Sequence, residues 1–147
     1  MLVNRRWLSA WFGATRSTQP EFERLGEVLD RFAALSLGQL PAESLAHHPR
    51  KQRNAMAFHF GAIDYLAACE ALGETETLAL YVRFLQRHAL GGTPQTGSVT
   101  HLLEEFTRED ERQQYRRAGL EAMQRWLADG NEKSAKRLSE MLRLIQG

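Results

Sequence analysis

Histidine and aspartate side chains in the middle of the chain have the types and spacing that could support chemistry. His59, Asp64 and His88 lie within one predicted pair of helices, and two facing histidines with a carboxylate could hold a metal ion. The chain has no His-Glu-x-x-His motif. We therefore expect solvated or hydrogen-bonded histidines, with no metal and no cofactor. A metal protein or helical-bundle enzyme around these three residues remains the second alternative function.

Nucleophilic chemistry has little support in this sequence. Cys69 is the single cysteine and stands in an apolar stretch, where a thiol acts as a small hydrophobic side chain. A lone cysteine forms no disulfide within the chain and suggests a reducing compartment. Gly91 and Gly92 lack the lysine and the spacing of a phosphate-binding loop. No catalytic residue is nominated, and we do not expect an enzyme.

Two groups of basic residues could contact nucleic acid. The first opens a helix with Arg50, Lys51 and Arg53, and the second runs along a later one: Arg108, Arg112, Arg116 and Arg117. The net charge of the chain is only +1, whereas binding to bulk nucleic acid needs a concentrated basic face. Acidic residues interleave with the second group, which favours salt bridges over a phosphate track. A nucleic-acid-binding regulator is the first alternative function.

An aromatic segment near the N-terminus is the candidate partner-binding site. Trp7, Trp11 and Phe12 share one face of a predicted helix that also carries Arg5 and Arg6. Tryptophan and arginine are favoured anchors at protein interfaces, so we expect docking on the core, a homodimer contact or a partner contact. Contact with a membrane interface is the other possibility. The segment is too short and too aromatic for a signal peptide, and we expect a cytoplasmic bacterial protein.

Helical periodicity extends over most of the chain, and strand patterns are nearly absent. The apolar spacing and the Gly, Pro and cap residues predict about six helices near 3–13, 20–37, 50–72, 75–90, 98–129 with a pause at 107, and 131–147. The Gly- and Pro-containing stretch 91–98 is the clearest predicted loop. The 147 residues fit a single domain, 1–147.

Two helical hairpins organise the predicted fold. A shift of 57 residues places Gly73 on Gly130, both as expected helix stops, and superposes apolar positions of segments 59–86 and 117–145. The first hairpin is apolar nearly all round, so it should be central. We predict an all-α compact bundle in which hairpin 55–90 is central, hairpin 109–146 flanks it, and N-terminal helices complete it.

The tight turn expected at Gly73 makes one geometric prediction. Residues at equal distance from the turn should lie level with each other, which places Asp64 beside Arg83, as an ion pair or in a shared hydrogen-bond network. With apolar helix faces and no convergent catalytic set, the leading interpretation is a small α-helical binding or adaptor module that acts through protein–protein contacts. The sequence does not identify its partner.

Overall fold

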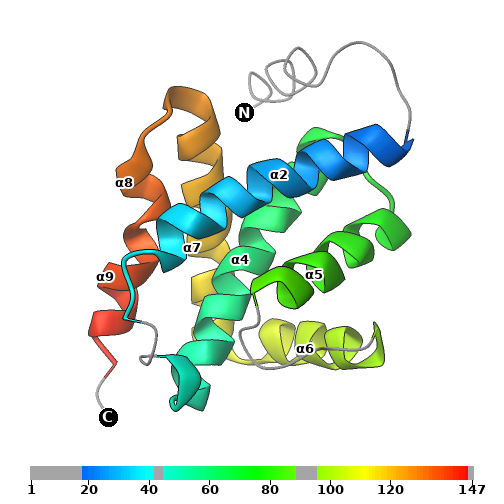
Figure 1. Ribbon diagram of the computed structural model, residues 1–147. Coiled ribbons are helices and arrows are strands. Elements are labelled where there is room, and N and C mark those ends of the chain that lie inside the picture. Colours follow the sequence, from blue (N-terminus) through cyan, green and yellow to red (C-terminus); the bar gives the residue numbers. More distant parts are fainter. Residues whose placement is uncertain (1–17, 42–44, 89–95, 146–147) are drawn as a thin grey trace.

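The computed structural model describes residues 18–41, 45–88 and 96–145, and these form helices joined by short turns, with no strand (Figure 1). The all-α bundle expected from the sequence is confirmed. The predicted helix over 3–13 lies outside the described residues. The helices, labelled as in Figure 1, are α2 (Thr18–Leu37), α4 (Pro49–Cys69), α5 (Glu74–His88), α6 (Thr96–Arg108), α7 (Asp110–Asp129), α8 (Glu132–Ala135) and α9 (Arg137–Arg143).

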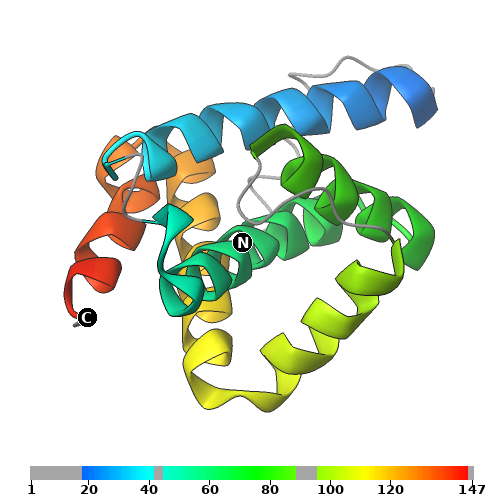
Figure 2. The same cartoon turned by 60° about the horizontal axis from the view of Figure 1, so that its bottom comes forward.

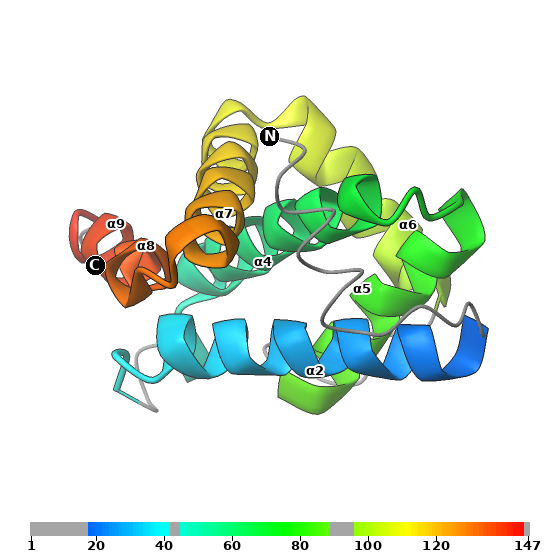
Figure 3. The same ribbon diagram turned by 90° about the horizontal axis from the view of Figure 1, so that it is seen from above.

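Helix α4 forms the centre of the bundle, as its apolar composition predicts. Every residue from Asn54 to Ile63 is buried. A helix that is apolar all round must be covered on several sides, and α4 runs between α7 on one side and α2 with α5 on the other (Figures 2 and 3). The core therefore surrounds α4, and Cys69 at its end is a buried thiol.

Two glycines set the closest approach between α4 and α7. A methyl group on Gly61 would overlap the carbonyl oxygen of Arg116, and a methyl group on Gly119 would overlap the carbonyl oxygen of Phe58. The contact is reciprocal, because each glycine faces the main chain of the other helix. Small residues let helix backbones come this close, and close backbones gain weak Cα–H···O contacts. The crossing of α4 and α7 thus depends on both glycines.

The main partner of α4 is α7 rather than its neighbour in sequence. Helix α4 packs far more extensively against α7 than against α5. Helix α5 diverges from α4 and lies against α2 as well (Figure 3). The central region predicted from the sequence is correct, but its two helices do not form a tightly paired hairpin. The expectation that residues at equal distance from the turn lie level with each other therefore does not apply to these two helices.

The turns after α4 and α7 differ in the residue that ends each helix. Ala71, with φ of 52°, is the left-handed residue after α4, and the Leu72 N–H donates to the Ala67 carbonyl at 2.9 Å. This bond is typical of a Schellman motif. After α7, Gly130 takes this role with φ of 70°. Gly73 is not the helix stop that we predicted, so the two turns are not equivalent, which weakens the match between segments 59–86 and 117–145.

The last third of the chain follows its predicted breaks with small corrections. Helices α6 and α7 are separated at Glu109, close to the predicted pause, and α6 includes residues 96–98, which we had assigned to a loop. Asn131 caps α8 by accepting from the Lys133 N–H at 3.0 Å. Lys136 then separates α8 from α9. Within the described helices, none has the length and apolar character needed to cross a membrane.

Candidate functional site

His59 lies fully buried in an aromatic cage at the centre of the bundle. Its ring stacks on Phe84, with centroids 4.6 Å apart, and meets Phe32 and Phe58 edge-on. The Nδ1 atom is 2.8 Å from the Ala55 carbonyl, and Nε2 is 2.5 Å from the Ser36 hydroxyl. The neutral ring that fits these partners donates from Nδ1 and accepts the Ser36 proton at Nε2.

Burial keeps His59 neutral, and its partners make it unavailable for chemistry. Loss of solvation lowers the pKa of His59 to about 3, although the hydrogen bond to Ala55 opposes this shift. Ser36 and His59 resemble a nucleophile–base pair, but both are completely buried. No substrate can reach them in this conformation. The pair is therefore a hydrogen-bonded link between α2 and α4.

The pH dependence of stability should report on His59. The unfolded ring takes up a proton near pH 6.5, whereas the folded ring resists protonation down to about pH 3. The contribution of the neutral His59 ring to the free energy of unfolding is therefore fully present above about pH 6.5 and is lost as the pH falls toward 3. We expect a loss approaching 1.4 kcal/mol per pH unit from this group, on the order of a few kcal/mol in total.

Urea denaturation at several pH values between about 7 and 5 measures this change in the free energy of unfolding. Most carboxylates stay ionised in that range, so they contribute little to the slope. His59→Gln should flatten the pH slope, while His101→Gln at an exposed position should leave it unchanged. An unchanged slope in His59→Gln would show that the folded ring accepts a proton normally.

His88 does not form a metal site with His59. Its ring lies near Phe84, with centroids 5.0 Å apart, and its Nε2 is 3.1 Å from Asp30 on α2. Both His59 nitrogens already have partners. In the ranges that the structure describes, no group of three or more His, Cys, Asp or Glu side chains is arranged to hold a metal ion. The metal alternative gains no geometric support.

Asp64 and Arg83 each have an ionic partner, but not each other. Asp64 accepts from Arg116 on α7, at 2.6 Å from Nε and 3.2 Å from Nη2, and also from the Tyr81 hydroxyl. The guanidinium of Arg83 pairs with Asp30 at 3.4 Å and lies over Gly26 of α2. The predicted pair is wrong because Asp64 faces α7 while Arg83 faces α2. Distance from the turn does not specify these directions.

The Asp64–Tyr81–Arg116 cluster is a fixed polar unit. Burial, followed by the charge of Asp64, raises the pKa of Tyr81, so the phenol stays protonated. Burial opposes the charge of Arg116, but the hydrogen bonds and charge of Asp64 outweigh it and raise its pKa. Asp64 is occupied by both partners and is not free to act as a base. The cluster suits binding rather than proton transfer.

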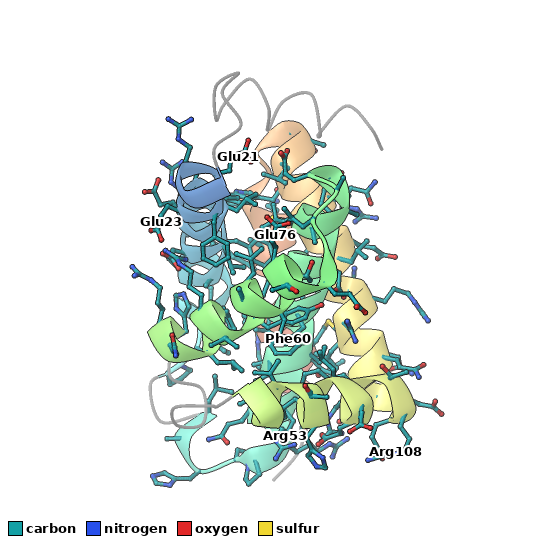
Figure 4. The ribbon with its side chains drawn as sticks, turned by 90° about the vertical axis from the view of Figure 1, so that its right-hand side faces the viewer. Glu21, Glu23, Arg53, Phe60, Glu76 and Arg108 are labelled. Atoms are coloured by element: carbon teal, nitrogen blue, oxygen red, sulfur yellow. The ribbon has the colours of Figure 1, made fainter. Side chains whose placement is uncertain are left out.

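A groove between α5 and α6 exposes part of this cluster; we call it the α5–α6 groove. It measures about 600 Å³, and its walls carry Leu72, Leu78 and Leu103, with Tyr81 and Arg116 also in the lining. The rest of the lining consists of Gly73, Glu74 and four threonines: Thr75, Thr77, Thr100 and Thr107. Phe60, between α5 and α6 in Figure 4, stacks on Tyr81 and contacts Phe106, which supports the two helices from behind.

The groove continues across α6. A second hollow of about 390 Å³ shares Thr100, Leu103 and Thr107 with it. The hydroxyls of Thr77 and Thr107 donate to main-chain carbonyls at 2.8 and 2.9 Å. These hydroxyl protons are used within the helices, so the two threonines are not activated nucleophiles. The surface is partly apolar and chemically unreactive.

The predicted basic groups form ion pairs. Arg50 makes a two-point contact with Glu111, at 2.9 and 2.6 Å, and Asn54 donates to the same carboxylate at 2.8 Å. The hydrogen bonds from Arg50 hold the pKa of Glu111 at about 2, although burial opposes this. The remaining pairs join Arg53 and Arg112 to Glu105, Arg112 to Glu111, Arg108 to Glu109, and Arg116 to Asp64.

The pairs of Arg108 with Glu109 and of Arg112 with Glu111 confirm the expected salt bridges of the second basic group, and the other pairs were not predicted. Most of them connect α4, α6 and α7, so they hold helices together rather than line a phosphate track. Lys51 and Arg117 form no ion pair among the described residues. Two separate cations do not make a concentrated basic face.

Trp7, Trp11 and Phe12 lie outside the described residues, so the predicted partner-binding segment stays a prediction. The structure instead identifies a second groove between α2 and α7, the α2–α7 groove. It measures about 510 Å³ and is lined by Val28 and Arg31 of α2 and by residues 126–130. Trp126 in this groove is only partly buried and its ring contacts Phe32, with centroids 5.7 Å apart.

Sequence reasoning missed the convergence that gives the α5–α6 groove its character. Arg116 was assigned to a basic group, and Tyr81 was not selected as a site residue. Ser36, the partner of buried His59, was not selected either. Helical spacing shows which residues share a face, but not which side chains from α4, α5 and α7 converge. Comparison with known proteins finds no matching family model, no significant match among curated proteins and none among solved structures.

Proposed function

We propose that this chain is a small α-helical adaptor that binds a segment of a partner protein in the α5–α6 groove. The observation that carries the proposal is a surface of two adjoining hollows, with leucine and threonine walls and a fixed guanidinium in the lining of the larger hollow. Such a combination of apolar walls and a few placed polar groups is typical of binding sites. The proposal extends the binding-module interpretation of the sequence.

The lining indicates the chemistry of the partner segment. Leu72, Leu78 and Leu103 favour aliphatic or aromatic side chains. Arg116 directs Nε and Nη2 toward Asp64 and Tyr81, and Nη1 has no hydrogen-bond partner among the described residues. A main-chain carbonyl or a carboxylate of the partner would bind there. We therefore propose a peptide segment with apolar side chains and an oxygen acceptor.

The alternative functions have less support. Ion pairing of Arg50, Arg53, Arg112 and Arg116 weakens the nucleic-acid proposal. The closed environment of His59 weakens the metal and enzyme proposals. Homodimer formation and a cytoplasmic location remain predictions of the sequence, compatible with an adaptor.

Adjacent substitutions on α5 test this proposal. Leu78 lines the groove, whereas Ala79 is exposed and does not. The wild type, Leu78→Glu and Ala79→Glu would each serve as bait in cells of the native organism, and the captured protein would then be purified for calorimetry. We expect Leu78→Glu to weaken binding at least about tenfold, because a charge replaces an apolar contact, and Ala79→Glu to bind like the wild type.

The folded state of each bait would be checked by circular dichroism. A partner that binds all three baits equally would place the interaction elsewhere on the molecule. Capture of nucleic acid that is lost on mutation of Lys51 and Arg117 would favour the regulator instead.

A further inference from the structure

The α2–α7 groove presents an aromatic wall that the described chain leaves partly open. Val28 and Leu127 form its buried base, and the indole of Trp126 forms one wall. Arg31 and Asp129 bring opposite charges to the rim. An apolar hollow with a charged rim is suited to hold aromatic side chains, since each aromatic residue buries about 150–250 Å².

Segment 1–17, immediately before α2, has the composition that fits this groove. Its predicted stripe contains Trp7, Leu8, Trp11 and Phe12. The segment also carries Arg5, Arg6 and Arg16 and no acidic residue. An aromatic stripe of this kind left in water would be an aggregation liability. A surface for it is therefore needed, and the segment is joined to one of the two helices that form the groove.

We propose that segment 1–17 docks in cis in the α2–α7 groove and places a tryptophan against Trp126. The connecting chain is long enough. Val28 lies ten residues along α2 from Thr18, which is about 15 Å in a helix. Trp11 lies seven residues before Thr18, and a chain of that length can extend about 23 Å. The tether keeps the segment at a high local concentration, which favours docking within one chain over association of two.

Charge complementarity supports the same occupant. The first half of α2 carries three carboxylates, Glu21, Glu23 and Glu27, against one arginine, Arg24, while Asp129 and Arg31 balance each other at the groove itself. Figure 4 shows Glu21 and Glu23 toward one end of the molecule and Arg108 toward the other. The arginines of the segment would thus approach the acidic first half of α2, and such complementarity favours this orientation over docking near Arg108 at the end of α6.

Paramagnetic broadening of the indole signals tests the proposal in the full-length chain. The chain has three tryptophans, Trp7, Trp11 and Trp126, so three indole N–H signals are expected. A spin label at Arg125→Cys, exposed near the groove, is placed in a Cys69→Ala background so that only one thiol reacts. The control label is Arg108→Cys at the end of α6, next to the start of α7, and the start of α7 lies about 22 Å from Arg125 along that helix.

Docking in cis predicts that the Arg125→Cys label removes most of the intensity of the Trp7 and Trp11 signals, and that the Arg108→Cys label does not. The loss should persist on dilution. A mixture of isotope-labelled chains with separate spin-labelled chains should show no such loss, and loss in that mixture would mean that a second copy occupies the groove. If both signals keep their intensity, the proposal is overturned. A shift of the Trp7 and Trp11 signals when anionic vesicles are added would then show that the segment binds a membrane surface.

Discussion

Replacing Gly61 or Gly119 with alanine should destabilise the fold by about 2–4 kcal/mol. In an isolated helix the same change would be favourable by about 1 kcal/mol. Here the added methyl group would overlap main-chain atoms of the facing helix, Arg116 in one case and Phe58 in the other. Main-chain atoms cannot rotate away, so α4 and α7 must separate and lose packing along their whole contact.

Urea denaturation followed by circular dichroism measures this effect. The matched control is Gly73→Ala, because an added methyl group there meets no heavy atom within 4 Å and the residue does not have a positive φ. We expect that control to lose no more than about 1 kcal/mol, because Gly73 precedes α5 as its N-cap, where glycine is preferred to alanine. A Gly61→Ala variant as stable as this control would show that the two helices do not make this close contact.

Replacing Asp64 with asparagine should cost about 2–3 kcal/mol. The change leaves the Arg116 guanidinium without its counter-charge and weakens the acceptor for the Tyr81 hydroxyl. Breaking a fully buried pair costs about 3–5 kcal/mol. The smaller value expected here allows for solvent at this site, since the side chains of Arg116 and Asp64 are 24% and 25% exposed.

A double-mutant cycle with Asp64→Asn and Arg116→Gln isolates the coupling between the two residues. We expect a coupling above about 1 kcal/mol, because the contact is two-point and partly buried. The surface pair of Glu132, the first residue of α8, and Lys136, the cap residue after it, provides a matched cycle with an expected coupling of about 0.3–0.5 kcal/mol. Equal couplings in the two cycles would mean that the cluster does not fix the floor of the α5–α6 groove.

Local sequence patterns predicted the helices well because those patterns act within one element. The apolar run of residues 55–72 indicated a covered helix, and Gly130 indicated a helix stop. Acids interleaved with Arg108 and Arg112 indicated ion pairs. Each of these inferences depends only on helical spacing and local backbone geometry, and each is confirmed. The pairs of Arg112 with Glu105 and of Arg116 with Asp64 join different helices, and local spacing did not predict them.

The choice of helix partners could not be predicted in the same way. We assumed that consecutive helices pair, whereas α4 packs mainly on α7 across about 50 residues of sequence. Gly61 inside a long apolar helix was the available signal, because a glycine at such a position commonly marks a close approach. Gly61 alone does not indicate which helix approaches α4 at this position, because its partner Gly119 is recognised only in the structure. The Asp64 pairing was wrong for this same reason.

The central claim is that a partner protein occupies the α5–α6 groove, and site-specific photo-cross-linking tests it most directly. A photoreactive phenylalanine analogue would replace Leu103 in the groove, with Gln114 on the exposed side of α7 as the control position. We predict that irradiation in cells of the native organism joins position 103, but not position 114, to one protein, and that Leu78→Glu abolishes this product. A protein product that forms equally at both positions, or only nucleic acid at either, would contradict the claim.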